Sequence, residues 1–173
     1  LLAGRPEDAP GTCVTCVMEG VRPVLAEIQA LVVPSSFGNP RRVSNGVEYN
    51  RAMLLLAVLE KRGGLLLGNC DAYLNVIGGL SLDEPAADLA AMLALASSFR
   101  DKPVPSDLAA IGEVGLTGEL RAVSNLGQRL SEVRRLGFTK CLIPKRIQGK
   151  LAAPEGLELI RVANIREALA ALL

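Results

Sequence analysis

The chain has 173 residues, of which 50% are hydrophobic and only 3% aromatic, with a formal net charge of +1. It contains no histidine, which excludes serine–histidine and cysteine–histidine catalysis and most zinc sites. Its length and hydrophobicity suit one domain with an aliphatic core, and its few aromatic residues argue against nucleobase stacking as a binding mode.

The first half of the chain is predicted to be rich in β-structure. Residues 1–11 form a lead-in rich in proline and glycine, and a loop is expected from Pro34 to Gly46. Apolar residues at helical spacing run up to Gly63 and Gly64, which end the pattern. We predict strands at 12–18, 23–33, 65–67 and 72–80, and a helix at 47–61.

The second half alternates between helices and strands. A helix over 84–99 carries Pro85 in its first turn and is apolar on nearly every face, so we expect it to be buried. We predict a β segment at 109–123 with three turn glycines, an amphipathic helix at 126–136, strands at 141–143 and 157–162, and a helix at 165–173. The order indicates an α/β fold of the α+β type, in which helices pack on a mixed β-sheet.

Cys13 and Cys16 form a C-x-x-C pair, which could be half of a zinc site or a redox pair. In a strand, however, residues three apart point to opposite faces, and no second pair completes a zinc site. We therefore predict buried, unreactive thiols. Free cysteines suit a reducing cytosol, and the absence of a run of 18 apolar residues predicts that no membrane is involved.

Basic residues are unevenly distributed. Residues 121–150 carry eight basic side chains and one acidic, and residues 41–62 carry five basic and two acidic. This distribution fits either a phosphate-binding surface or ordinary solvated loops. No base-reading constellation is visible, so DNA binding would be independent of sequence. The candidate phosphate contacts are Arg41, Arg42, Arg51, Lys145 and Arg146, with Arg22 as a weaker candidate.

No nucleotide-binding glycine motif occurs, so the chain itself is not expected to hydrolyse ATP. Asp83, Glu84 and Asp88 could suggest a metal site. Acidic residues in a first turn also complement the helix dipole, and we favour that interpretation. We expect neither a metal nor a cofactor in this chain.

Four stretches, in this order and spacing, resemble the C-terminal domain of the RadA (Sms) family of bacterial DNA-repair ATPases. They are Met-Glu-Gly-Val-Arg-Pro at 18–23 with 27–32, Phe-Gly-Asn-Pro-Arg-Arg at 37–42 with 49–51, 56–62, and 71–73 with 78–79. The resemblance implies that residues 1–11 are the junction after an upstream RecA-like ATPase and that 12–173 form a Lon-protease-like domain.

Residues 82–144 also resemble the proteolytic domain of Lon, which implies its fold, the ribosomal-protein domain 2-like superfold. That family places a nucleophilic serine in Gly-Pro-Ser-Ala-Gly, and the matching turn here runs from Glu84 to Asp88 with Ala86 at the serine position. The family places its lysine base a fixed distance after a strand that matches residues 112–118. Counting forward from that strand puts Gly127 at the lysine position. A methyl group cannot attack a carbonyl and glycine cannot accept a proton, so no catalytic residue is expected. Ala86 and Gly127 should lie near one another.

The RadA resemblance implies a role in DNA repair and recombination. The domain would serve as a DNA-binding and ring-assembly platform in a hexamer, for branch migration by a helicase-like motor. Recombination proteins are further possible partners, and the full-length protein would use ATP, magnesium and zinc. Two alternatives stay open, which are a residual peptidase or peptide-binding module and a purely structural oligomerisation domain.

Overall fold

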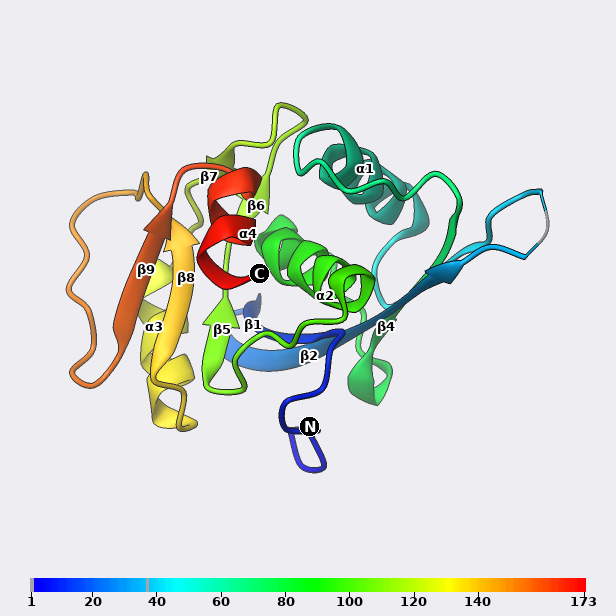
Figure 1. Ribbon diagram of the computed structural model, residues 1–173. Coiled ribbons are helices and arrows are strands. Elements are labelled where there is room, and N and C mark those ends of the chain that lie inside the picture. The colour runs from blue at the N-terminus through cyan, green and yellow to red at the C-terminus, as the bar shows by residue number, and fades with distance from the viewer. Residues whose placement is uncertain (1, 37) are drawn as a thin grey trace.

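The computed structural model describes residues 2–36 and 38–173, and these form a seven-stranded mixed sheet in the order β3-β4-β2-β1-β5-β8-β9 (Figure 1). Strands β1, β2 and β4 run antiparallel to their neighbours within this group, whereas the pairs β3–β4, β1–β5, β5–β8 and β8–β9 are parallel. The strands are β1 (Thr12–Glu19), β2 (Arg22–Pro34), β3 (Arg42–Asn45), β4 (Cys70–Val76), β5 (Leu108–Ala110), β8 (Lys140–Pro144) and β9 (Glu158–Val162).

Helices cover both faces of the sheet, which gives three layers. Helices α1 (Tyr49–Lys61), α2 (Asp88–Arg100) and α4 (Ile165–Leu172) share one apolar cluster on one face, and α3 (Leu126–Arg135) belongs to a second cluster on the other face (Figure 1). Two 3-10 turns, η1 (Ile77–Gly79) and η2 (Pro85–Ala87), and a separate pair of short strands, β6 (Glu113–Val114) and β7 (Leu120–Arg121), complete the fold. The predicted fold class is confirmed.

Helix α2 is the centre of the larger apolar cluster. Its residues are buried continuously from Asp88 to Ser97, as expected for a helix that is apolar on nearly every face. It packs against β1 and β2 on one side, and α1 and α4 flank it. The 3-10 turn η2 leads directly into α2. Pro85 suits the first position of this turn, because proline has no backbone N–H and the first N–H groups of a helix have no partner within it.

Four sequence predictions differ from the structure. The strand predicted at 72–80 ends at Val76, where the chain turns into η1 with Gly78 at a φ of 86°. The predicted loop before Gly46 contains β3, which lies at the edge of the sheet and pairs with β4. Residues 65–67 form an irregular loop and not the predicted strand, although the side chains of Leu65 and Leu67 are buried in the core. The predicted segment 109–123 is divided into β5, β6 and β7, and the β6–β7 connection turns at Gly118, which has a φ of 83°.

The lead-in packs against the domain. Gly11 donates its N–H to the Ser97 hydroxyl at 2.9 Å, and the Arg5 guanidinium donates to the Ser106 carbonyl at 3.1 Å. Arg5 also lies 5.2 Å from the centre of the Phe138 ring. Leu1 of the lead-in, and Phe37 of one stretch that carries the RadA resemblance, lie outside the described residues.

The two cysteines of the C-x-x-C pair lie on opposite faces of β1, as predicted. Cys13 belongs to the larger apolar cluster, which contains α2, and Cys16 belongs to the second cluster, which contains α3. Burial raises the pKa of each thiol to about 12. Among residues 2–36 and 38–173, no group of three or more cysteine, aspartate or glutamate side chains could hold a metal ion. No helix in this part of the chain is long and apolar enough to cross a membrane.

We expect a small disulfide reagent at pH 8 to modify the native protein rapidly at Cys70 only. Cys70 is half-buried, whereas Cys13, Cys16 and Cys141 are buried, and burial also raises the pKa of Cys141. Few thiolates would therefore be available at the buried positions. Absorbance of the released thiolate measures the reaction. Cys70→Ser should remove the fast phase, and urea should expose the other three thiols. Rapid native reaction at Cys13 or Cys16 would contradict the expectation.

Candidate functional site

The two positions that match the Lon dyad lie in adjoining segments. Ala86 is buried in η2, with 4% of its surface exposed, and Gly127 lies in the first turn of α3. A Cβ atom at Gly127 would meet no atom within 4 Å, because this position faces a hollow of about 520 Å³ between the start of α3 and residues 147–152. Neither position offers a nucleophile or a proton acceptor.

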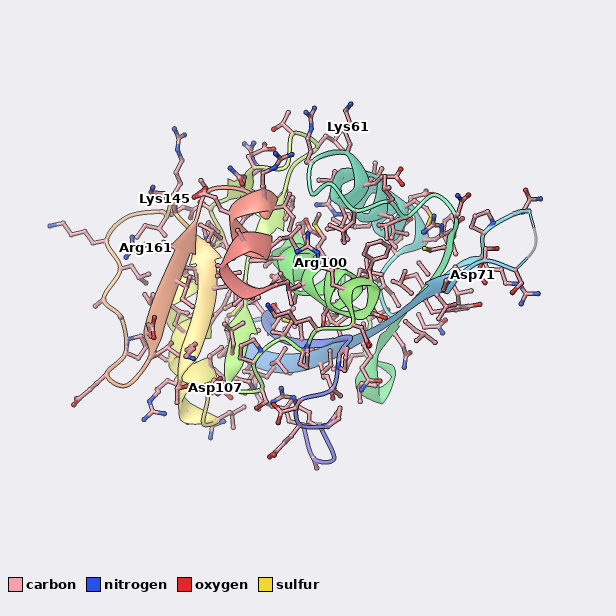
Figure 2. The ribbon with its side chains drawn as sticks, viewed as in Figure 1. Lys61, Asp71, Arg100, Asp107, Lys145 and Arg161 are labelled. Atoms are coloured by element: carbon pink, nitrogen blue, oxygen red, sulfur yellow. The ribbon has the colours of Figure 1, made fainter. Side chains whose placement is uncertain are left out.

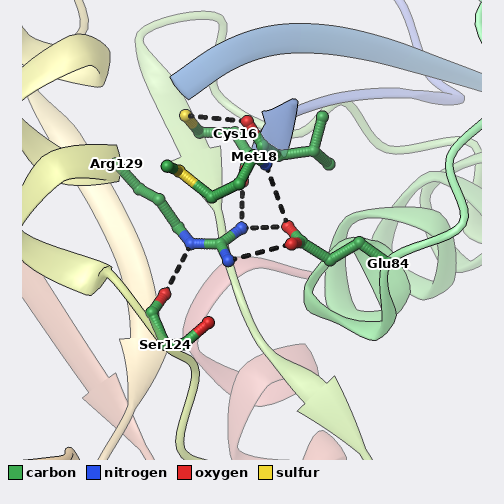
Figure 3. A network of polar contacts seen from close by, with 6 residues as sticks. Cys16, Met18, Glu84, Ser124 and Arg129 are labelled. Atoms are coloured by element: carbon green, nitrogen blue, oxygen red, sulfur yellow. Dashed lines mark hydrogen bonds and ion pairs between the residues drawn. The ribbon is translucent and has the colours of Figure 1, made fainter. Parts of the chain in front are cut away.

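A buried ion pair joins the two segments. Arg129, two residues after Gly127, is 1% exposed and bonds to Glu84, two residues before Ala86 (Figure 3). The pairing is bidentate: Nη1 contacts Oε1, and Nη2 donates to Oε2 at 3.0 Å. This geometry matches the planar fork of a guanidinium to both carboxylate oxygens. Glu84 stands at the first glycine of the family turn, so the side chain that makes this contact is absent from the family pattern.

Arg129 donates two further hydrogen bonds, to backbone carbonyls. Nε donates to the Ser124 carbonyl at 2.8 Å and Nη1 to the Cys16 carbonyl at 3.0 Å, while the Met18 N–H donates to Glu84 at 3.2 Å (Figure 3). The network therefore ties together β1, the turn before α2 and the loop before α3. Arg129 is one of the eight basic residues in 121–150, and its charge alone does not distinguish it from the exposed ones. Its spacing from Leu126 and Val133, which places it on the apolar face of the helix, was the available signal.

A second ion pair holds the other end of the same turn. Asp88 is 3% exposed and accepts hydrogen bonds from Arg51 Nε and from the Val114 N–H, each at 3.0 Å. Burial raises the pKa of Asp88, and the hydrogen bonds from Arg51 and Val114 oppose that shift. The pair joins α1, α2 and β6. Asp88 and Glu84 thus serve as ion-pair partners, in addition to any effect on the helix dipole that the sequence suggested.

The predicted phosphate contacts differ in availability. The Arg51 guanidinium is held by Asp88, and Arg42 is half-buried and donates to the Leu67 carbonyl at 2.9 Å. The Arg41 side chain is exposed and makes no hydrogen bond or ion pair among the described residues. Its backbone N–H donates to Asp71 at 2.7 Å, and its carbonyl accepts from the Ala72 N–H at 2.9 Å. Lys145 and Arg146 are exposed after β8, and Arg22 is exposed at the β1–β2 turn.

The candidate cations do not form a single cluster. Arg41 precedes the edge strand β3, whereas Lys145 follows β8, near the other edge of the sheet (Figure 2). Lys145 and Arg146 line a hollow of about 640 Å³ between β7 and the β8–β9 loop. Arg121 lines it too, although its guanidinium bonds to Glu119 at 2.9 Å. The basic residues of 121–150 are therefore dispersed: Arg121, Lys145 and Arg146 line this hollow, Arg129 is buried, and the others lie on α3, on β8 and in the β8–β9 loop.

A crevice of about 280 Å³ separates the starts of α1 and α2. Its walls include Val47, Leu55 and Leu82, and its carboxylates include Glu48 and Asp83. Glu48 caps α1 by accepting a hydrogen bond from the Arg51 N–H. An apolar crevice with carboxylates beside it suits an apolar side chain that has a basic neighbour.

Residues 71–173 match the family model of the Lon protease (S16) C-terminal proteolytic domain. Over 168 residues, or 97% of the chain, the sequence is 54% identical to the DNA repair protein RadA of Bacillus subtilis (strain 168). The corresponding identities are 51% for Listeria monocytogenes RadA and 49% for Streptococcus pneumoniae RadA. The chain spans 37% to 40% of the lengths of these relatives.

We expect Glu84→Ala to lower the free energy of unfolding by about 2–4 kcal/mol, because it leaves the buried Arg129 charge without its carboxylate. Urea unfolding followed by circular dichroism measures the change. Arg135→Ala on the same helix is the matched control. That residue is exposed and bonds to Glu132 at 2.7 Å, so the urea midpoint should stay near that of the wild type.

The double variant Glu84→Ala/Arg129→Met should recover part of the lost stability, since it also removes the uncompensated charge. The assignment of this network as a structural clamp fails if Glu84→Ala unfolds at the same urea concentration as Arg135→Ala.

Proposed function

Because the chain belongs to the Lon protease C-terminal proteolytic domain family, we propose that it is a non-proteolytic member that works in DNA repair. The proposed loss of proteolysis rests on one observation, which is that Ala86 and Gly127 stand where the resemblance to Lon expects the nucleophile and the base. The similarity to RadA over nearly the whole chain supports the repair role. In this proposal the domain is a platform for DNA binding and for ring assembly.

The proposal extends to the longer protein. There the domain belongs to a cytoplasmic, hexameric, ATP-dependent motor of the helicase-like class, which drives branch migration during recombination. ATP and magnesium serve an upstream RecA-like domain, zinc serves a further module, and recombination proteins are the partners. Self-association would remove exposed apolar side chains such as Val21, Leu66 and Leu116 from water, which is favourable.

DNA binding in this proposal rests on phosphate contacts. Arg41, Lys145 and Arg146 are exposed, and no carboxylate pairs with their side chains among the described residues. Arg22 and Arg42 add to these contacts, Arg42 with part of its guanidinium already engaged. Arg51 acts chiefly by fixing α1 to α2. The two groups lie toward opposite edges of the sheet, so they engage separate stretches of the backbone, and binding is independent of base sequence.

A second candidate function is peptide binding in the crevice between α1 and α2. Its apolar walls and the carboxylates of Glu48 and Asp83 favour a segment with an apolar residue beside a basic one. This function needs no dyad. A purely structural oligomerisation domain is the third candidate. The exposed apolar residues favour it if substitution of Arg41, Lys145 and Arg146 leaves DNA binding unchanged.

We expect Arg41→Ala, and separately Lys145→Ala/Arg146→Ala, to weaken binding to a random-sequence duplex. Each lost phosphate contact should reduce the slope of log affinity against log salt by about 0.9. Fluorescence anisotropy at four salt concentrations measures both quantities. Arg135→Ala is the control, because its charge is already paired with Glu132. A folded variant with an unchanged affinity and slope would remove that group from the DNA contacts.

We also expect no cleavage of an unfolded protein such as casein by the purified chain. The reason is the absent nucleophile and base, and a gel assay over several hours measures it. Peptidase activity that survives repurification, and that a substitution in this domain abolishes, would overturn the proposed loss of proteolysis.

A further inference from the structure

One part of the sheet carries an apolar row on its outer face. Leu31 on β2 and Val43 on β3 both pair in register with Tyr73 on β4, so the three side chains stand side by side across three strands. Leu31 is 56% exposed, Val43 is 42% exposed and Tyr73 is half-buried. The alternate residues Ala72 and Leu74 point the other way, into the α2 cluster.

The helices leave this row uncovered. Helices α1 and α2 lie on the opposite face of β4 and β2 (Figure 1). Helix α3 shares the face of the row, but it packs against β1 and the earlier part of β2, where Leu25 belongs to its cluster. Apolar side chains gathered on an exposed sheet face indicate a binding surface more often than scattered ones do.

Polar groups frame the row on both sides. Asn75 pairs in register with Gln29 and with Asn45 on one side, and Asp71 lies on the other. Both asparagines are exposed, and their amides can donate and accept hydrogen bonds. The row of Leu31, Tyr73 and Val43 with these polar neighbours is hereafter the Tyr73 platform.

A hollow of about 560 Å³ adjoins the platform. Tyr73, Asp71 and Arg41 line it, together with the loop that precedes β3. The Arg41 guanidinium has no partner among the described residues, so an unpaired cation and the half-buried Tyr73 ring line the same hollow. The hollow falls within the range of about 300–1,000 Å³ that is common for small-ligand sites, and a single nucleotide matches that scale.

We propose that the Tyr73 platform binds single-stranded DNA, with one base stacked on the Tyr73 ring between Leu31 and Val43 and with its phosphate on Arg41. The inference rests on the proposed DNA-binding function and names a different form of the ligand. Stacking accepts any base, because every base has a π-face. A duplex hides its base faces in its own stack, so the ring selects unpaired strands.

Charge and size favour a nucleic acid over a protein as the occupant. The free guanidinium of Arg41 complements a phosphate, and amides beside an aromatic ring can meet the edges of a base. The row is three residues wide, whereas a standard protein interface uses about 20–30 residues on each side. The low aromatic content that argued against stacking is no obstacle, because the site uses one ring and two aliphatic neighbours.

The test is fluorescence anisotropy of the 173-residue chain with a labelled 12-nucleotide oligothymidylate and with a 12-base-pair duplex. Tyr73→Ala should lower the affinity for the single strand about 10-fold, as expected for the loss of one stacked base, and should leave duplex affinity unchanged. Tyr73→Phe retains the ring and should bind like the wild type. Tyr49→Ala is the matched control, because Tyr49 is a 53% exposed tyrosine on α1.

Val43→Glu is a second variant in case Tyr73→Ala does not fold. It places a negative charge in the exposed row on the edge strand, and it too should weaken single-strand binding alone. Unchanged single-strand affinity in a folded Tyr73→Ala protein that still binds duplex overturns the inference and leaves the proposed function intact. Absence of duplex binding by the wild type, with single-strand binding that depends on Tyr73, contradicts the duplex proposal and supports the platform. If Tyr73→Ala or Val43→Glu changes the sedimentation coefficient of the protein but not its DNA affinity, the face binds a second copy of the chain, and the inference is overturned.

Discussion

The buried charge of Arg129 is the constraint on which the segments around Ala86 and Gly127 depend. Transferring a guanidinium out of water costs several kcal/mol, and that cost is offset only when its donors and its charge are matched. Here the partners are Glu84, the Ser124 carbonyl and the Cys16 carbonyl, which come from three separate segments. A shift of any one segment would leave a buried donor unpaired. The ion pair therefore fixes β1, the turn before α2 and the start of α3 as one unit.

The segments around Ala86 and Gly127 are joined by ion pairs. Glu84 and Asp88 flank the η2 turn, and each bonds to an arginine from a different helix, α3 and α1 respectively. The turn that would present a nucleophile in a protease is thus held at both ends by structural ion pairs. Its rigidity supports the packing of α2, whose burial organises the larger apolar cluster.

Patterns local in sequence predicted the fold well, and contacts between distant residues account for what was missed. The uninterrupted apolar run of α2 predicted its burial, and the strand period placed Cys13 and Cys16 on opposite faces. Strand β3 is stabilised by pairing with β4, which a window of loop-like residues cannot reveal. Arg51 and Arg129 carry the same charge as surface arginines. Their ion pairs are made with acidic residues 37 and 45 positions away along the chain.

The parallel pairing of β1 with β5 has a consequence for how the chain folds. Val14 pairs with Ala109, so the centre of the sheet closes only after the whole intervening segment has been made. The β1–β2 hairpin and β4 can pair early, but the apolar face that includes Val14 and Cys16 waits for α3 and β8, which follow still later. Long-range pairings of this kind slow folding. During synthesis on the ribosome, the apolar face of the β1–β2 hairpin would stay in contact with water until the last third of the domain emerges. In that interval the chain is most prone to aggregate and most accessible to chaperones.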